Sequence, residues 1–286
     1  MKVIKHFFEF IFIIIFFLIF KIIGYKYSTN FGEFIGKKIG PFFRSNKKIQ
    51  QNLTNSNIGN SNKDREIIIE NMWGNYGRIF AEYMFIKKYR ETNLYQNIEI
   101  IGQNILEQIK DNKKPVIFIS GHFNNFEFMA MHIERSGIDL AAIYRPLNNK
   151  FLNPIMEKIR KNYICKNQIK KGIGGIKELV KLNNDGFSTA LMIDQRVSEG
   201  IKSNFFNAKA FTTTIPAQLV KKYKIPVVPI FIERFDDVKF KVTVLKPINF
   251  NENKSVEDIT DHLNKMLENF IKEKPDYWIW SHNRWK

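Results

Sequence analysis

The feature that most restricts the fold lies near the amino terminus, where residues 10–20 form an unbroken apolar run. The run widens to residues 7–23 when Glu9 and Lys21, one near each end, are included. A helix that crosses a bilayer needs about 20 apolar residues, and charged side chains near its ends can reach the polar head groups. The sequence therefore predicts an N-terminal membrane helix within residues 1–24.

Two other interpretations of this segment remain open. A cleaved signal peptide is disfavoured, because the residues that follow offer no small-x-small cleavage site and contain more lysine. A helix that lies partly in the membrane interface is compatible with the same residues. Lys2 and Lys5 precede the segment, whereas seven lysines and arginines lie between residues 21 and 48. Because the more basic flank tends to stay in the cytoplasm, we expect the globular part to face the cytoplasm.

The balance of charges narrows the class of partner. Lysine and arginine number 45 against 28 aspartates and glutamates, which gives a formal net charge of +17. Such an excess suits nucleic acid, an anionic membrane surface or an acidic partner. The sequence has no zinc-finger spacing, no RNP-like aromatic motif and no basic repeat, so we expect no nucleic acid. With one cysteine, Cys165, and no supported histidine pair, we expect neither a metal nor another cofactor.

Beyond the anchor, the pattern changes from helical to alternating strands and helices. Residues 45–63 are polar and predict a loop, and the apolar spacing over residues 64–90 predicts a helix. We predict a helical region over residues 25–95. Over residues 96–286 we predict an α/β domain with a mostly parallel central sheet flanked by helices. The predicted strands are 98–101, 116–120, 140–144, 189–193, 227–232 and 239–245, and the predicted helices are 125–135, 150–162, 175–182, 214–223 and 255–272.

The most informative stretch is residues 115–127, which read Pro-Val-Ile-Phe-Ile-Ser-Gly-His-Phe-Asn-Asn-Phe-Glu. An apolar strand ends at Ser120, Gly121 permits a sharp turn, and His122 follows at the strand end, where open α/β sheets bind ligands. Glu127 in the first turn of the next helix could reach back to fix the imidazole tautomer and raise its basicity. A histidine held in this way can act as a general base, worth ~10²–10⁴ in rate. The alternative is structural, because Asn124-x-x-Glu127 alone fits a helix capping box.

The same stretch resembles the His-x-x-x-x-Asp/Glu motif of glycerolipid acyltransferases. Its form with glutamate resembles the lauroyl/myristoyl acyltransferases of lipid A biosynthesis, the late acyltransferases of Gram-negative bacteria. Further blocks resemble that family in the same order along the chain: 142–146 (Ala-Ile-Tyr-Arg-Pro), 192–195 (Met-Ile-Asp-Gln), 205–206 (Phe-Phe), 210–214 (Ala-Phe-Thr-Thr-Thr), 225–229 (Ile-Pro-Val-Val-Pro) and 277–285 (Tyr-Trp-Ile-Trp-Ser-His-Asn-Arg-Trp).

The resemblance implies direct transfer of a fatty acyl chain at the bacterial inner membrane during lipopolysaccharide biosynthesis. The donor would be acyl-(acyl carrier protein), a small acidic protein, and the acceptor a hydroxyl of a phosphorylated lipid A precursor. His122 would take the hydroxyl proton and Glu127 would stabilise the imidazolium. No Gly-x-Ser-x-Gly elbow points to an acyl-enzyme. Other acceptors, such as a lysophospholipid, an aminolipid or a mannosylated phosphoinositide, remain alternatives, as does a non-catalytic lipid-binding protein.

Four further residues are candidates for substrate binding. Arg145 follows a predicted strand and either binds a phosphate or is a surface charge. Asp194 ends another strand and either orients Arg196, His122 or a substrate hydroxyl, or caps a turn. By the resemblance Gln195 belongs to the same block, and Arg196 stands where relatives often carry aspartate, so its role is open. Phe205 and its neighbours suit an acyl groove or the core, and the tryptophans at 278, 280 and 285 suit a membrane interface.

Overall fold

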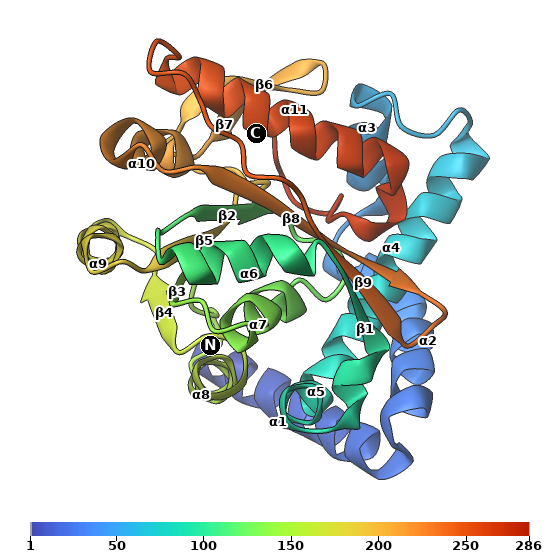
Figure 1. Ribbon diagram of the computed structural model, residues 1–286. Helices are drawn as coiled ribbons and strands as arrows, with labels where there is room; N and C mark the ends of the chain where they lie inside the picture. Colours follow the sequence, from blue (N-terminus) through green and yellow to red (C-terminus); the bar gives the residue numbers. More distant parts are fainter. Residues whose placement is uncertain (1, 286) are drawn as a thin grey trace.

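A seven-stranded sheet forms the centre of the computed structural model, which describes residues 2–285 (Figure 1). Residues 1 and 286, the outer limits of the predicted anchor and α/β domain, lie outside the described range. The strands are β1 (Ile98–Ile101), β2 (Ile117–Ser120), β3 (Leu140–Tyr144), β4 (Asn167–Lys170), β5 (Ser188–Met192), β8 (Val227–Phe235) and β9 (Lys239–Val244), and β6 (Ile201–Phe205) pairs with β7 (Ala208–Thr212) in a separate hairpin.

The sheet is mostly parallel, as predicted from the alternation of strands and helices. Its order is β1-β9-β8-β2-β5-β3-β4, and the five strands from β8 to β4 are mutually parallel. Strand β9 is antiparallel to β8, and β1 is parallel to β9. The five parallel strands therefore end at one edge, which we call the carboxyl edge. The opposite edge, which we call the amino edge, is where β1 and β9 end, so that Ile101 and Leu245 lie there.

Helices cover both faces of the sheet, because parallel strands need crossover connections. Helices α6, α7 and α8 lie below the sheet in Figure 1, and α10 and α11 lie above it. All four residues of β2 are buried, as expected for a central strand covered on both faces. The helices are α1 (Lys2–Ile23), α2 (Tyr25–Phe43), α3 (Asn46–Asn55), α4 (Asn62–Glu82), α5 (Ile86–Glu91), α6 (Gln103–Asn112), α7 (Glu127–Arg135), α8 (Asn153–Tyr163), α9 (Ile173–Asn184), α10 (Ile215–Tyr223) and α11 (Val256–Glu273), with short 3-10 helices η1 (Tyr83–Phe85), η2 (Asn93–Asn97) and η3 (Pro275–Tyr277).

Within the N-terminal helical region, α2 and α4 make an unusually close contact. Gly32, Gly36 and Gly40 share one side of α2 and face Trp73 and Gly77 of α4. A Cβ atom at position 36 would lie 2.1 Å from the Trp73 carbonyl oxygen, so only glycine permits this approach. Buried side chains from α1 to the C-terminal segment belong to one apolar core. The division into an anchor, a helical region and an α/β domain stays a prediction.

Several local predictions were wrong or incomplete. The polar stretch 45–63, predicted as a loop, contains helix α3, which has only two buried apolar side chains, Ile49 and Leu53. The helix predicted over 64–90 breaks at residues 83–85 into a 3-10 turn before α5. Helix α2 lies in the predicted helical region without bounds of its own having been predicted, and helix α6, the edge strand β4 and the β6–β7 hairpin were not predicted from the sequence.

The C-terminal tryptophans lie in the core and not at a membrane interface, which corrects the sequence-based expectation for two of them. Trp278 and Trp280 are fully buried and contact each other edge to face. Phe205 packs against Trp278 and Trp285, so it is a core residue and not part of an acyl groove. The fully buried Arg284 donates hydrogen bonds to Phe211 O (2.6 Å) and Thr212 Oγ1 (2.7 Å), which tie the C-terminal segment to the hairpin.

Candidate active site

A cavity of about 340 Å³ opens at the carboxyl edge, where open α/β sheets place their ligand sites. Its wall is formed by the ends of β2, β3 and β5, by α7 and α8, and by the loop after β5. The lining includes five of the six candidate residues from the sequence: His122, Glu127, Arg145, Gln195 and Arg196. The sixth, Asp194, is fully buried directly behind the wall.

The register of the sheet brings His122 and Asp194 together. Ser120 at the end of β2 pairs with Met192 at the end of β5, and His122 and Asp194 each follow two residues later. The His122 Nδ1 atom lies 2.8 Å from Asp194 Oδ1, and the His122 backbone N–H donates to Asp194 Oδ2 at 3.0 Å. With Nδ1–H donating to the carboxylate, the neutral imidazole keeps its free lone pair on Nε2. Of the three partners considered for Asp194, the structure therefore selects His122.

The electrostatics of this pair favour a basic imidazole. Burial acts to lower the pKa of His122, but the Asp194 carboxylate, supported by the more remote Glu127, outweighs it and raises the pKa above the ordinary value of 6.5. Burial likewise acts to raise the pKa of Asp194, but His122 and the hydrogen bonds to its carboxylate lower that pKa to about 2. Asp194 is therefore ionised throughout the physiological range, and an imidazolium formed at His122 has its counter-ion in contact.

Glu127 lines the same cavity but does not form the direct pair with His122 that the sequence suggested. Its Oε1 accepts from Arg160 Nε at 2.8 Å and from Arg160 Nη2 at 2.6 Å, and Tyr83 donates its hydroxyl to the same oxygen. Because Glu127 begins α7, its side chain meets α8 and η1, whereas Asp194 already occupies Nδ1. The side chain of Arg160 is 12% exposed, so the ion pair is largely desolvated.

Asn124 does not form the capping box that was the structural alternative for this segment. It adopts a left-handed backbone conformation with φ of 42°, and its side-chain amide donates to Ile232 O at 3.3 Å. The next residue, Asn125, donates to Glu82 Oε2 at 3.0 Å, and Glu82 in turn forms a buried ion pair with Arg234. The side chains of Asn124 and Asn125 thus fix the start of α7 through long-range contacts to β8 and α4, and not through a local capping box.

Trp278 is a site residue that the sequence analysis placed elsewhere. Its indole Nε1–H donates to Asp194 Oδ2 at 2.9 Å, so the aspartate is held by His122 on one side and by the C-terminal segment on the other. Tyr83 and Arg160 were also missed. Neither stands in a recognisable motif, because an arginine within a helix such as α8 is usually a solvated charge, and only its approach to Glu127 distinguishes it.

Three basic side chains surround the mouth of the cavity. Arg145 and Lys171 follow β3 and β4 and are exposed, and both line the cavity. Arg196 stacks its guanidinium 5.4 Å from the Phe211 ring, and its Nε is buried with no hydrogen-bond partner among the described residues. A buried donor without a partner costs free energy, while the guanidinium as a whole still lines the cavity. This cluster fits a phosphate group.

Gln195 and His282 complete the polar part of the wall. The Gln195 amide nitrogen lies 3.5 Å from His122 Nε2, beside the position of the transferable proton. His282 Nε2 accepts from the Arg196 backbone N–H at 3.2 Å, which fixes the loop after β5. Burial, together with the nearby positive charges, lowers the pKa of His282 to about 4, so His282 is neutral and structural at physiological pH.

The inner part of the cavity is apolar and suits a hydrocarbon chain. Apolar side chains from α7, β3 and β5 and from the residue after α8 line it: Ala130, Ala142, Ile143, Ile164, Ala190 and Met192. Among residues 2–285, no group of three or more histidine, cysteine, aspartate or glutamate side chains is placed to bind a metal ion. The buried Cys165 has its pKa raised to about 12 by burial and the nearby Glu134, so it is a packing residue.

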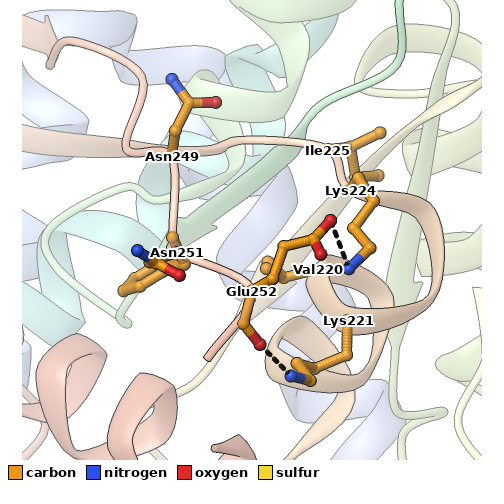
Figure 2. Close-up of a pocket in the computed structure, with 8 residues that line it drawn as sticks. Val220, Lys221, Lys224, Ile225, Asn249, Asn251 and Glu252 are labelled. Atoms are coloured by element: carbon orange, nitrogen blue, oxygen red, sulfur yellow. Dashed lines mark hydrogen bonds and ion pairs between the residues drawn. The ribbon is translucent and has the colours of Figure 1, made fainter. Parts of the chain in front are cut away.

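A second, smaller hollow of about 120 Å³ lies at the amino edge, between the end of α10 and the loop after β9 (Figure 2). Figure 2 shows Lys221 and Lys224 turned toward Glu252. Lys224 Nζ forms an ion pair with Glu252 Oε1 at 2.9 Å, and Lys221 Nζ donates to the Glu252 carbonyl at 2.6 Å. All three side chains are exposed or nearly so, and these contacts leave no buried polar group for a ligand to satisfy.

Comparisons with known proteins indicate one family. The family described as bacterial lipid A biosynthesis acyltransferase matches residues 2–286. The chain is 22% identical over 255 residues to "Lipid A biosynthesis acyltransferase 2" of Shigella flexneri, covering 86% of this chain and 79% of the relative. It is 22% identical over 228 residues to "Lipid A biosynthesis myristoyltransferase" of Escherichia coli strain K12, covering 77% and 68%. The crystal structure of the 1-acyl-sn-glycerophosphate acyltransferase PlsC from Thermotoga maritima aligns with a TM-score of 0.42 and 13% identity, over 96% of this chain and 99% of that one.

Proposed function

This chain belongs to the bacterial lipid A biosynthesis acyltransferases, and from that premise we propose that it moves a fatty acyl chain from acyl-(acyl carrier protein) to a hydroxyl of a lipid A precursor. The observation that carries the proposal is the His122–Asp194 pair at the mouth of an apolar cavity. An imidazole with its Nδ1–H on a buried carboxylate and its Nε2 toward the cavity is suited to take a proton from an alcohol.

The proposed reaction is a direct transfer. The acceptor hydroxyl loses its proton to His122 Nε2 as its oxygen attacks the carbonyl carbon of the donor thioester. The C–S bond then breaks, and the leaving thiolate takes the proton from the imidazolium. Asp194 stabilises the imidazolium by contact, without accepting its proton, because its pKa is about 2. No covalent acyl-enzyme is needed.

Two groups beside the imidazole are proposed to stabilise the negative charge on the carbonyl oxygen. The Gln195 amide lies next to His122 Nε2. The Arg160 guanidinium lines the cavity and is held in place by Glu127 and Tyr83. Donors fixed before the reaction stabilise developing charge without reorganisation. We therefore assign Glu127 a positioning role for Arg160, with a smaller electrostatic effect on the pKa of His122.

Recognition of the acceptor is assigned to the basic mouth. Arg145, Lys171 and the guanidinium of Arg196 offer donors for a phosphate group of the lipid A precursor. The donor is proposed to be acyl-(acyl carrier protein), because an acidic carrier is attracted by a chain of net charge +17. The site of action would be the cytoplasmic face of the inner membrane, in lipopolysaccharide biosynthesis.

The test uses the purified full chain in detergent. The donor is acyl-(acyl carrier protein) with a radiolabel in its acyl chain, and the acceptor is a lipid A precursor. Wild type should transfer the label to the lipid, and His122→Ala should lose about 10²–10⁴ of that rate while keeping the wild-type melting temperature. His262→Ala is the matched control, since His262 is an exposed histidine on α11, far from the cavity. Retained transfer in His122→Ala would reject His122 as the base.

The same assay discriminates between acceptors. Transfer to a lysophospholipid but not to the lipid A precursor would keep the chemistry and reject the acceptor. Lipid binding without transfer to either would reject the enzyme function. The same question can be tested in cells by mass spectrometry of lipid A from a strain that lacks this protein. We expect one secondary acyl chain to be missing, and an unchanged lipid A would contradict the proposal.

A further inference from the structure

Helix α1 is packed against the globular part at both of its ends. Near its amino end, the Asn149 side-chain amide donates to the His6 carbonyl oxygen at 2.8 Å, and the ring of Phe7 lies 5.6 Å from that of Phe151. Near its carboxyl end, Phe17 is buried against Phe80 of α4, with ring centroids 5.1 Å apart. Figure 1 shows α1 running along the bottom of the molecule from beside α8 to the foot of α2.

The outer face of α1 is as apolar as the inner face. Helices that lie on a soluble domain usually show a polar outer face, but α1 exposes ten large apolar side chains. These residues recur every three or four positions along the whole helix: Val3, Ile4, Phe7, Phe8, Ile11, Phe12, Ile15, Leu18, Ile19 and Ile22. With the inner face already covered by protein, this outer face needs a hydrocarbon environment of its own.

The apolar surface continues past α1 to the mouth of the cavity. The loop after β3 carries Arg145 of the mouth and then Asn149, which holds α1. The loop after β3 and the first turn of α9 also expose large apolar side chains to solvent at this carboxyl edge. These are Leu147 and Phe151 after β3, and Ile173 (81% exposed) and Ile176 (45% exposed) after β4. We call these four residues, together with the outer face of α1, the apolar edge.

We propose that α1 lies along the surface of one leaflet and does not cross the bilayer, so that the apolar edge enters the leaflet and the cavity opens at its head groups. The occupant of the apolar edge is a phospholipid leaflet, and an anionic one because the chain carries a formal net charge of +17. The inference rests on the proposed function in one respect, which is that the acceptor is a membrane lipid. With α1 on the surface, that lipid can reach His122 while its own acyl chains stay in the membrane. The length of α1 alone does not decide between the two orientations, since its 22 residues are long enough to span.

Two observations oppose the spanning orientation. A 22-residue helix is about 33 Å long, so a spanning α1 would carry His6 and Phe7 to the far side of the bilayer and break their contacts with Asn149 and Phe151. Glu9 lies within the segment, 3.4 Å from the Asn149 amide and 3.8 Å from Lys5. Parallel to the surface, Glu9 keeps these partners at head-group depth, whereas in a span it would have to leave Asn149 and extend toward the far head groups, which costs free energy.

The deciding experiment determines on which side of the membrane each end of α1 lies. Single cysteines are introduced at Lys2, Lys26 and Ile101 in a Cys165→Ala background and treated with an impermeant maleimide in intact spheroplasts and in lysed membranes. Ile101 reports the side of the globular part. We expect all three cysteines to react only after lysis. A Lys2→Cys variant that reacts in intact spheroplasts while the other two stay protected would overturn the proposal.

A second measurement tests the apolar edge with a matched pair of positions. Ile176 at the carboxyl edge and Ile101 at the amino edge are the same residue type and both 45% exposed. An environment-sensitive fluorophore on Ile176→Cys should be quenched at least severalfold more than one on Ile101→Cys by nitroxide-labelled lipid in anionic vesicles. Equal quenching at both positions would reject the edge. Both readouts are independent of acyl transfer, so loss of the proposed function would leave them interpretable.

Discussion

The two edges of the sheet each carry a hollow lined by basic residues, but they differ in how those charges are held. At the amino edge, Lys224 and Glu252 form an exposed ion pair. At the carboxyl edge, Arg160 and Glu127 form a largely desolvated pair, with side chains 12% and 8% exposed, and the aspartate behind the imidazole has no exposure. Charge and concavity are therefore common to both edges, and burial is what separates them.

The comparison shows why the carboxyl edge can do chemistry. In a desolvated setting a carboxylate acts on its neighbour with little screening, so Asp194 can raise the pKa of His122 against the effect of burial. In the exposed hollow, solvent screens the same type of interaction. The loss of acyl transfer or of stability in a variant should therefore depend on how deeply the altered charge is buried, and not on how many charges are removed.

The largest effect is expected from Asp194→Asn. The substitution keeps the shape but removes the charge that stabilises the imidazolium, and an equivalent change in a histidine–aspartate pair lowers kcat by about 10⁴. Removing the carboxylate also leaves burial as the main influence on His122, so its pKa should fall. The pH below which kcat/KM declines should therefore move to lower values, as measured by pH profiles of acyl transfer.

This prediction also decides between the two carboxylates. If Glu127→Gln lowers the rate more than Asp194→Asn and moves the acidic decline of kcat/KM further, Glu127 would be the partner of His122 in the reacting complex. The pairing of His122 with Glu127 that the sequence predicted would then hold in the reacting complex, and the His122–Asp194 pair would belong only to the protein without substrate.

The next effect is on stability, at the Arg160–Glu127 pair. Glu127→Ala leaves the Arg160 guanidinium without its carboxylate in a desolvated position, which should lower the free energy of unfolding by about 3–5 kcal/mol. Thermal denaturation in detergent measures the loss. The double variant Glu127→Ala/Arg160→Met removes both charges and should recover most of it. A single variant that melts like wild type would mean that the pair is solvated.

A smaller effect is expected from Trp278→Phe. The ring keeps its packing against Phe205, but Asp194 loses one hydrogen bond, and such bonds to charged groups are worth about 1.5–3 kcal/mol. We expect kcat to fall by roughly tenfold with the acidic decline of the pH profile unchanged, because the charge of Asp194 remains. A shift of that decline as large as in Asp194→Asn would contradict a positioning role.

The smallest effect is expected at the amino edge, from Lys224→Ala. The lysine is exposed and its ion pair with Glu252 is screened by solvent. Acyl transfer and melting temperature should both match wild type within error. A loss of transfer in this variant would show that the amino edge takes part in binding a substrate, and the comparison between the edges would fail.

The sequence predicted the strands of the sheet well and its margins poorly. Strands β1 and β3 were predicted to the residue, because each is a compact apolar run between polar segments. Strand β4 was missed because it lies at the edge of the sheet and buries only Ile169, so it shows no apolar pattern. The β6–β7 hairpin was missed for a similar reason, since it packs outside the main sheet and alternates weakly.

In the site, the sequence identified the histidine but paired it directly with Glu127, and it named Asp194 as a partner of His122 only as one of several possibilities. His122 stands out because it follows a buried strand and a glycine. Asp194 lies 72 positions away along the chain, and it meets His122 only because β2 and β5 are neighbours in register. Trp278 could not be assigned from spacing, because its contact with Asp194 depends on how the C-terminal segment folds back. The roles of Arg145, Gln195 and Arg196 stay predictions.

The return of Trp278 to Asp194 has a consequence for the order of events during translation. Helix α1 leaves the ribosome before the rest of residues 2–285, whereas the indole that completes the support of Asp194 emerges after the described strands of the sheet. Domains fold as their segments are synthesised. His122 therefore lacks part of its support until the C-terminal segment has been made and folded back, which delays any reaction with lipid until that segment has emerged.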